Sequence, residues 1–529
     1  MQRLLSIALL FAASAFAGGI PVATYHNDNF RSGWNSSETA LTTANVSSTT
    51  FGKVFSYAVD GYVYAQPLYM PGLNVNGAKH NVVFMATEGD SVYAFDADHS
   101  GPALWRRSFT DQAHKVTTVP SGDVGTGDLI PQIGITGTPV IDPASGTLYV
   151  VAKTKEASAQ NINYVQRLHA LDIATGNERT GSPVVIAASV PGNCGVTDGQ
   201  GNVIFSSLIQ AQRPALLLSH GVVYIGWASH GDNGPYSGWL MGYDARSLQQ
   251  VGVFNTVPND HDPNHLCRAG IWQGGGGPAA DAAGNIYFAT GNGTFDANRE
   301  GGQEYGDSIL KLAANQGLSA SDYFAPSDQS SLNQSDTDLG SGGVLLLPPQ
   351  PGQVSDLLVQ SGKEGTIYLL DRNNFGQFDS HGNRQILQSL NQAIGGVWGT
   401  PVYANGTVYF SGSFDTIKAF VIQNGKLNPT PVQSPGGFGF PGPGLAISSA
   451  ADGSNAILWA IDPQLYTAHG PCVLHAYNAA NVAQELYNSK QNAQRDDPGG
   501  AVKFAVPLVA NGRVYVGAVN KVSVYGLLH

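Results

Sequence analysis

Charged side chains are scarce in this sequence. Lysine and arginine together number 26, aspartate and glutamate 38, and the four types make up 12% of the residues. The formal net charge at pH 7 is −12, and no cluster of basic residues offsets it. Because a negatively charged surface repels phosphate backbones, the composition argues against nucleic acid as a partner.

Long glycine-free segments are lacking as well. The chain contains 66 glycines and 29 prolines, and both residues weaken helix interiors. With 42% hydrophobic residues, this composition is typical of a turn-rich all-β protein and excludes long helices as its main element.

Apolar runs long enough to cross a bilayer are absent, and the one run of note lies at the N-terminus. Residues 4–16 are apolar, Arg3 precedes them, and Ala15-Phe16-Ala17 has the small residues of a cleavage site. The run is too short for a membrane span with flanks, so we interpret residues 1–17 as a signal peptide rather than a buried helix. The mature chain, 18–529, is expected to be secreted or periplasmic.

Cysteines number only three: Cys194, Cys267 and Cys472. An exported protein permits disulfides, and an odd count leaves one thiol over. Cys194 and Cys267 both follow predicted outer strands in loops, so we favour their pairing, with Cys472 free or buried. No Cys-x-x-Cys-His motif for haem attachment is present. Any electrons would therefore leave through a separate carrier.

A repeat of short strands runs along the whole chain. Its second strand is aromatic and aliphatic and recurs eight times, at residues 83–85, 148–150, 223–225, 286–288, 357–359, 408–410, 457–459 and 514–516. A third strand, often ending in Asp, follows at residues 93–96, 169–172, 242–244 and 368–371, with weaker copies near Leu310, Ala419, Ala476 and Val524. Three to four strands per unit predict an eight-bladed β-propeller that occupies residues 18–529 as one domain. Two separate β-sandwiches would not explain the shared repeat.

The two ends of the chain predict how the ring closes. The last unit ends at residues 524–528, directly after its third strand, and so lacks an outer strand. A spare strand at residues 52–59 precedes the first unit and can supply it. Pairing the two would remove the exposed edges of an open ring.

Several segments carry a resemblance to a known family. Tyr-Ala-Phe-Asp at 93–96 and Gly-Thr-Ile-Tyr-Leu-Leu-Asp-Arg at 365–372 resemble repeats of the alcohol dehydrogenases that depend on pyrroloquinoline quinone (PQQ). Segments 25–31, 134–142 and 291–296 resemble a group of exported bacterial proteins with PQQ-like repeats. The resemblance covers the chain end to end and implies the propeller fold.

The resemblance also implies a site. Those dehydrogenases hold PQQ over the propeller mouth, with Ca²⁺ or a lanthanide bound by a Glu, an Asn and the catalytic Asp. Asn292 matches the Asn, Asp338 the catalytic Asp, and Lys363 a basic residue that contacts the quinone. The position of the ligand Glu falls near Asp232 and Asn233. Oxygen ligands of this kind suit a hard cation such as Ca²⁺.

The sequence departs from that family at two features of its cofactor site. Two adjacent cysteines and a following Arg, which grips a PQQ carboxylate, are missing from the matching segment, Gly-Thr-Gly-Asp-Leu-Ile-Pro at 125–131. The sequence also predicts few cations at the mouth for a cofactor with three carboxylates.

Trp239, Trp272 and Trp398 stand near predicted strand ends, where propeller mouths are lined. Stacking on a planar ring or a sugar is one interpretation, and packing between blades is the other. We keep Trp272 and Trp398 as candidates for cofactor binding.

Two functions remain open from the sequence. The favoured one is an exported, monomeric binding or scaffold propeller without catalysis, which keeps remnants of a quinoprotein site and takes a small molecule or another exported protein as its partner. The alternative is a dehydrogenase that uses PQQ and Ca²⁺ to oxidise an alcohol or sugar. In it Asp338 is the base, Asn292, Asp338 and Asp232 or Asn233 hold the metal, and Lys363 contacts the quinone.

Overall fold

The computed structural model describes residues 19–259, 267–315 and 317–528. The expected signal peptide, residues 1–17, lies outside the described residues. Within the described part of the chain, no helix is long and apolar enough to cross a membrane.

Helices are few and short in the described residues. Two are α-helical, α1 (Gln329–Gln334) and α2 (Ala493–Asp496). Six are 3-10 turns: η1 (Gln112–His114), η2 (Ser121–Val124), η3 (Gln273–Gly275), η4 (Leu339–Ser341), η5 (Tyr466–Ala468) and η6 (Ser489–Asn492). The rest of the regular structure is β, as the glycine and proline content predicts.

The first half of the chain forms three large sheets and a ribbon. The first sheet contains β3 (Leu68–Val75), β4 (Ala78–Thr87), β5 (Ser91–Asp96) and β6 (Trp105–Ser108). The second contains β7 (Val116–Pro120), β8 (Gln132–Ile133), β9 (Val140–Asp142), β10 (Thr147–Ala157), β11 (Ile162–Asp172) and β12 (Val184–Val185). The third contains β15 (Gln210–Ala211), β16 (Leu217–Ser219), β17 (Val222–Ser229), β18 (Trp239–Asp244) and β19 (Gln250–Asn255). The ribbon pairs β13 (Ser189–Pro191) with β14 (Asn202–Ile204).

The second half adds five more sheets. The fourth contains β20 (Ala279–Ala280), β21 (Ile286–Ala289), β22 (Ile309–Ala313), β23 (Ser319–Ala325) and β27 (Gln377–Phe378). The fifth contains β24 (Leu345–Leu346), β25 (Leu357–Ser361), β26 (Ile367–Asp371) and β28 (Gln388–Leu390). The sixth contains β29 (Val402–Ala404), β30 (Thr407–Ser411), β31 (Ile417–Gln423), β32 (Lys426–Leu427) and β33 (Val432–Gln433). The seventh contains β1 (Trp34–Asn35), β34 (Gly444–Ser448), β35 (Ile457–Asp462), β36 (Val473–Asn478) and β37 (Glu485–Asn488), and the eighth β2 (Phe51–Tyr62), β38 (Leu508–Ala510) and β39 (Arg513–Leu527).

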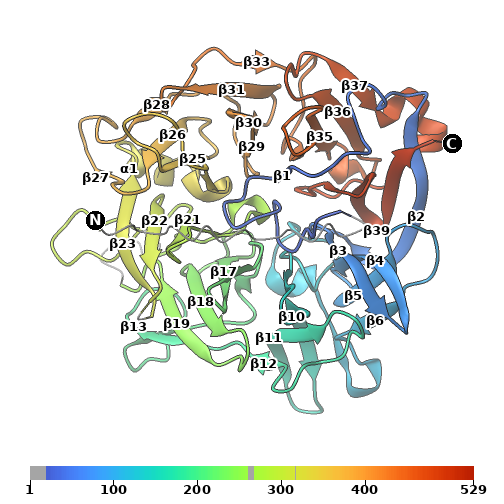
Figure 1. The fold of residues 1–529 in the computed structure, drawn as a ribbon. Coiled ribbons are helices and arrows are strands. Elements are labelled where there is room, and N and C mark those ends of the chain that lie inside the picture. The colour runs from blue at the N-terminus through green and yellow to red at the C-terminus, as the bar shows by residue number, and fades with distance from the viewer. Residues whose placement is uncertain (1–18, 260–266, 316, 529) are drawn as a thin grey trace, which may run out of the picture.

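These sheets are arranged around a common centre as an all-β propeller (Figure 1). Each of the eight predicted second strands lies in a different large sheet, on β4, β10, β17, β21, β25, β30, β35 and β39. The sequence repeat therefore corresponds to the repeat of sheets in space.

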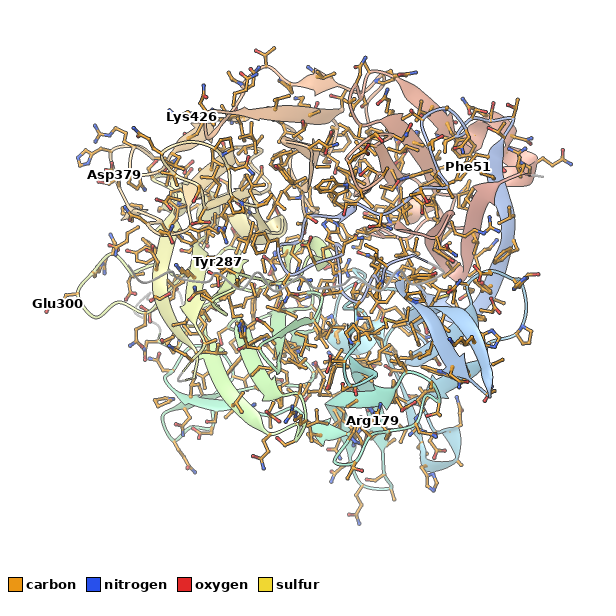
Figure 2. The ribbon with its side chains drawn as sticks, in the orientation of Figure 1. Phe51, Arg179, Tyr287, Glu300, Asp379 and Lys426 are labelled. Carbon is orange, nitrogen blue, oxygen red and sulfur yellow. A yellow bond between two sulfur atoms is a disulfide. The ribbon has the colours of Figure 1, made fainter. Side chains whose placement is uncertain are left out.

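The hydrophobic core lies between neighbouring sheets, where side chains fill the spaces between the ribbons (Figure 2). One cluster joins β4 of the first sheet to β10 of the second, and another joins β10 to β17 of the third. The series continues sheet by sheet to a cluster that joins β35 to β39. A further cluster packs Tyr57 and Val524 of the eighth sheet against Val83 and Phe95 of the first. Apolar contact thus connects the last sheet to the first.

The N-terminal strand β2 pairs antiparallel with β39, from Phe51 opposite Leu527 to Tyr62 opposite Val519. The two strands run side by side at one edge of Figure 1, blue beside red. The sequence predicts this pairing at residues 52–59. Phe51 is fully buried and contacts Trp459, Tyr487 and Tyr525, so the strand also contributes to the core.

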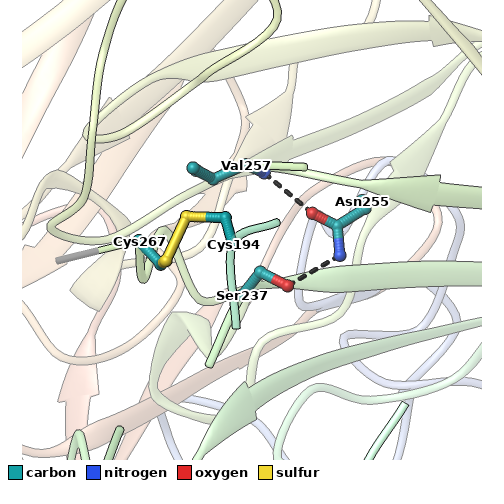
Figure 3. The surroundings of a disulfide bond; sticks show 5 residues. All are labelled: Cys194, Ser237, Asn255, Val257 and Cys267. Atoms are coloured by element: carbon teal, nitrogen blue, oxygen red, sulfur yellow. Dashed lines mark hydrogen bonds between the residues drawn. A yellow bond between two sulfur atoms is a disulfide. The ribbon is translucent and has the colours of Figure 1, made fainter. Parts of the chain in front are cut away.

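Cys194 and Cys267 form a disulfide, the pairing that the sequence favours, with their Cα atoms 5.4 Å apart (Figure 3). Cys472 is free and buried. Beside the disulfide, Asn255 donates a hydrogen bond to Ser237 and accepts one from the Val257 amide. The disulfide ties the segment after β13 to the segment between β19 and β20.

Candidate functional site

A pocket of about 400 Å³ opens where loops from several sheets meet. Its ionisable lining comprises Asp128, Asp232, Asp336, Asp338, Arg213, Lys363, Lys503 and His230, and its aromatic lining comprises Trp272, Trp398, Phe440 and Phe504. These residues span much of the sequence. Only the fold brings them together.

Asp338 lies at the centre of the polar part of this pocket. It immediately precedes η4 and is 4% exposed. The Lys363 ammonium lies 2.5 Å from the Oδ2 atom of Asp338, and the backbone amide of Asn292 donates a hydrogen bond to the Oδ1 atom of Asp338 at 2.7 Å. Gly291 permits this approach, because a Cβ atom there would lie only 2.2 Å from Asp338 Oδ1. The three residues assigned by resemblance therefore converge.

Lys363 follows β25 and is held from two sides. Its Nζ atom donates to the backbone oxygen and the Oδ1 atom of Asp336, each at 3.1 Å. The same ammonium lies 6.0 Å from the centre of the Trp272 ring. The lysine thus links the acidic group to the aromatic wall of the pocket.

Asn292 follows β21 and is 3% exposed. Its Nδ2 atom donates to Asp336 Oδ1 at 2.8 Å, whereas its Oδ1 atom is buried without a hydrogen-bond partner among the described residues. A buried, unpaired amide oxygen is costly, so it marks a position where a ligand would be stabilising.

Burial raises the pKa of the Asp338 carboxyl, and the Lys363 ammonium opposes part of that effect. Asp307 lies behind it and accepts a hydrogen bond from the Leu339 amide at 3.0 Å. Burial first, and then the charge of Asp338, raise the pKa of Asp307 well above its usual range. The sequence analysis missed Asp307, because it belongs to no motif and reaches the site only through the fold.

Asp232 and Asn233 differ in their placement. Asp232 lines the pocket, and its Oδ1 atom accepts a hydrogen bond from the Tyr236 hydroxyl at 2.6 Å. Asn233 donates to the Val124 carbonyl at 2.8 Å and is not part of the lining. Across the residues that the structure describes, no group of three or more His, Cys, Asp or Glu could hold a metal. The predicted calcium ligand set is thus reduced to Asn292, Asp338 and Asp232.

The three tryptophans also separate into two roles. Trp239 is 1% exposed and packs in the core between the second and third sheets. Trp272 and Trp398 line the pocket, and Trp398 meets Phe440 edge to face with ring centres 4.9 Å apart. Their faces can accept a planar ligand.

The structure adds two cations to the one that the sequence analysis assigned to the mouth. Arg213 and Lys503 line the same pocket as Lys363. Arg213 lies between β15 and β16 and Lys503 precedes β38, so neither stands in a segment that the family resemblance marks. The pocket therefore has three cationic side chains beside four aspartates, and Arg213 is the cation without an ion pair among the described residues.

The comparisons with known proteins agree with this architecture. Residues 76–377 match the family described as glucose/ethanol/alcohol dehydrogenase, β-propeller domain, the PQQ family. The chain belongs to this family. A search of curated protein sequences returns no match.

Solved structures of alcohol and methanol dehydrogenases share the fold of this PQQ-family chain. A quinohemoprotein alcohol dehydrogenase from Pseudomonas putida HK5 is 14% identical with a TM-score of 0.62, covering 96% of this chain and 80% of that one. The quinohemoprotein alcohol dehydrogenase from Comamonas testosteroni is 16% identical with a TM-score of 0.61 and the same coverage. A europium-containing methanol dehydrogenase is 13% identical with a TM-score of 0.61, covering 96% of this chain and 98% of that one. At these identities the likeness concerns the fold.

The segment that departs from the PQQ dehydrogenases, residues 125–131, lies at the same pocket. Thr126, Asp128 and Leu129 of this segment line the pocket.

Proposed function

We propose that this PQQ-family chain is a closed, eight-bladed propeller whose central pocket binds PQQ and supports oxidation of an alcohol or sugar hydroxyl. The observation that carries the proposal is the convergence of Asp338, Lys363 and Asn292 in one pocket with Trp272 and Trp398. The closed ring is supported by the pairing of β2 with β39 and by the apolar cluster between the eighth and first sheets.

The pocket fits the chemistry of PQQ, a flat tricyclic ring with three carboxylates. Two tryptophan rings provide faces for a planar group, and Arg213, Lys363 and Lys503 provide positive charge. When bound, PQQ accepts the two electrons that an alcohol loses on becoming a carbonyl compound.

The side chains of the pocket would supply the proton chemistry. Asp338 is the base that would take the proton of the substrate hydroxyl, because it is the buried carboxylate at the centre of the site. Lys363 positions that carboxylate through the ion pair at 2.5 Å. Burial raises the Asp338 pKa toward the range in which a carboxylate accepts a proton more readily.

A hard cation fits this site only in part. The unpaired Asn292 Oδ1 atom, Asp338 and Asp232 supply oxygen donors of the right kind. Both Asp338 oxygens already accept hydrogen bonds or an ion pair, and no cluster of three acidic or histidine ligands is found in the described ranges. The proposed proton transfer from the substrate hydroxyl to Asp338 therefore includes no metal.

A second candidate function is a binding propeller without catalysis. It is favoured because both oxygens of Asp338 already have partners. Lys363 balances the charge of Asp338 at one oxygen, and the Asn292 backbone amide donates a hydrogen bond to the other. In that case the pocket would hold an anionic small molecule and leave it unchanged.

Export is part of the proposal. The apolar segment of residues 4–16 with Ala15-Phe16-Ala17 supports cleavage after residue 17. The disulfide between Cys194 and Cys267 is suited to an oxidising compartment such as the periplasm or the exterior.

Replacement of the proposed base separates the two functions. In the protein loaded with PQQ and Ca²⁺, Asp338→Asn is expected to reduce the rate of alcohol-dependent dye reduction by about 100-fold or more, since general-base catalysis contributes about 10²- to 10⁴-fold. The affinity for PQQ should be kept, because the lysine and tryptophans remain. Asp198→Asn, in an exposed turn, is the control with the same change of charge. Wild-type protein that binds PQQ but oxidises none of a panel of alcohols and sugars would support the binding protein instead.

A further inference from the structure

Arg213 is a buried cation that the charges of Glu88 and Asp128 favour from a distance, without a close ion pair among the described residues. Arg213 is 8% exposed, and the hydrogen bond that its guanidinium donates to the Gly274 carbonyl oxygen is long, at 3.4 Å. No aspartate or glutamate forms an ion pair with it in the described part of the chain. Buried guanidinium groups are normally paired, so this one is prepared for an anion from outside the chain.

Aromatic rings hold the Arg213 guanidinium in place. Its centre lies 5.2 Å from the ring of Tyr64 and 5.2 Å from the ring of Phe504. Gly275 leaves room for it, because a Cβ atom there would lie 3.0 Å from the Arg213 Nη1 atom. A guanidinium between two rings keeps its orientation while its remaining donors stay available.

Lys503 adds a second cation to the same wall. Its Nζ atom lies 5.5 Å from the Phe504 ring, which also contacts Arg213. Asp128 is the nearest carboxylate, 3.6 Å away, and its side chain is 58% exposed. Burial lowers the pKa of Lys503, and the positive charge of Arg213 lowers it further. Two cations are thus brought together on one ring, beside one exposed carboxylate.

The backbone of Phe504 gives an independent sign of a ligand site. Its φ angle is 66°, in the left-handed region that bulky residues rarely adopt. Strain of this kind persists where the surrounding structure imposes it, and it concentrates at ligand clamps. Here it places one ring against both cations.

We propose that Arg213 and Lys503, held on the Phe504 ring, form a carboxylate clamp on the wall of the pocket, in the role left vacant by the changed segment 125–131. The inference rests on the proposed function and deepens it, because it gives the ligand an orientation. Carboxylates face Arg213 and Lys503, and the reacting part of the ligand faces Lys363 and Asp338. Asp128 of that segment lies 3.6 Å from the Lys503 Nζ atom, so the segment and the clamp share one wall of the pocket.

The clamp is tested with two probes that share a ring system. PQQ carries three carboxylates, and its trimethyl ester carries the same rings without those charges. Dissociation constants from quenching of tryptophan fluorescence are expected to rise about 10- to 100-fold for PQQ in Arg213→Gln, the worth of a charge-assisted hydrogen bond. The constant for the trimethyl ester should stay within about twofold. Lys503→Gln should show the same selective loss.

Two controls make the result decisive. Arg384→Gln removes the same charge at the periphery, where its side chain is 73% exposed beside Asp379, which Figure 2 labels at the outer edge. It should change neither constant. Arg213→Lys keeps the charge and should retain part of the preference for PQQ, which covers the case in which Arg213→Gln folds poorly. Unchanged PQQ affinity in both folded variants, Arg213→Gln and Lys503→Gln, would overturn the clamp alone. Failure of the wild-type protein to bind PQQ would overturn the proposed function with it.

Discussion

A mature chain shortened to begin after residue 60 is expected to aggregate and to show no cooperative thermal transition. The truncation removes all of β2 up to Asp60 and leaves β39 without its partner from Lys521 to Leu527. An exposed strand edge of this length is a site for association between molecules. It also removes Phe51 and Tyr57 from the two clusters that flank the eighth sheet. Gel filtration and calorimetry of the truncated and mature proteins provide the measurement.

A point variant tests the same closure without deleting chain. Phe51→Ala should lower the free energy of unfolding by about 3–5 kcal/mol, the usual cost of removing a buried phenylalanine. Phe414→Ala, at a side chain 82% exposed, should change it by less than about 0.5 kcal/mol. A truncated protein that stays monomeric and melts like the mature chain would contradict a ring closed by the N-terminal strand.

Lys153→Met is expected to lower the free energy of unfolding by about 1–3 kcal/mol, the cost of leaving buried hydrogen-bond acceptors without their donor. Lys153 is 2% exposed, and its Nζ atom lies 2.7 Å from His230 Nε2 and 2.8 Å from the Leu208 carbonyl oxygen. Glu88 and Asp90 are the carboxylates whose charges favour the protonated lysine. Without it, both would lie buried with less positive charge nearby.

A matched control lies on the same strand. Lys155, two residues along β10, pairs with Asp123 at 2.6 Å, and the two side chains are 23% and 22% exposed. Lys155→Met should therefore cost about 1 kcal/mol or less. Urea unfolding followed by circular dichroism compares the two variants. Equal losses in both would show that the buried cluster contributes no more than a surface pair.

The same cluster predicts a pH dependence. Burial raises the pKa of Glu88 from 4.5 to about 7, so the folded state binds more protons than the unfolded state between these values, and stability falls as pH rises through that window. Burial lowers the pKa of Lys153 from 10.5 to about 7, so the unfolded state binds more protons above pH 7, and stability rises again. The contribution of the cluster to stability should thus be lowest near pH 7, and Lys153→Met should lack the rise above it.

The fold could be predicted from the sequence because the patterns that indicate it are local. The strands near Tyr149, Tyr287 and Tyr409 alternate with turns of glycine and asparagine. The same pattern of strand and turn recurs in each unit of the repeat. The spare strand at residues 52–59 could be predicted for the same reason, because its apolar pattern indicates a strand that has no pairing partner nearby in the chain.

The pocket could be predicted from the sequence only in part. Asn292, Asp338 and Lys363 were predicted because they match residues of the family that the sequence resembles. Arg213 was not, because its environment is made by Tyr64 and Phe504, which approach it only when the ring of sheets is assembled. Residues of this kind lie in loops without periodicity, and their chemistry depends on contacts distant in sequence.

The most direct test of the account is a titration of the mature, full-length protein with PQQ, with and without Ca²⁺. Trp272 and Trp398 line the pocket, so their fluorescence should be quenched in a saturable way, with one PQQ bound per chain and a shift in the absorbance of the quinone. Binding should weaken as salt is added, because Arg213, Lys363 and Lys503 attract the carboxylates. Fluorescence and absorbance that change only in proportion to added PQQ, with or without Ca²⁺ and without saturation, would contradict the central claim that this pocket is a PQQ site.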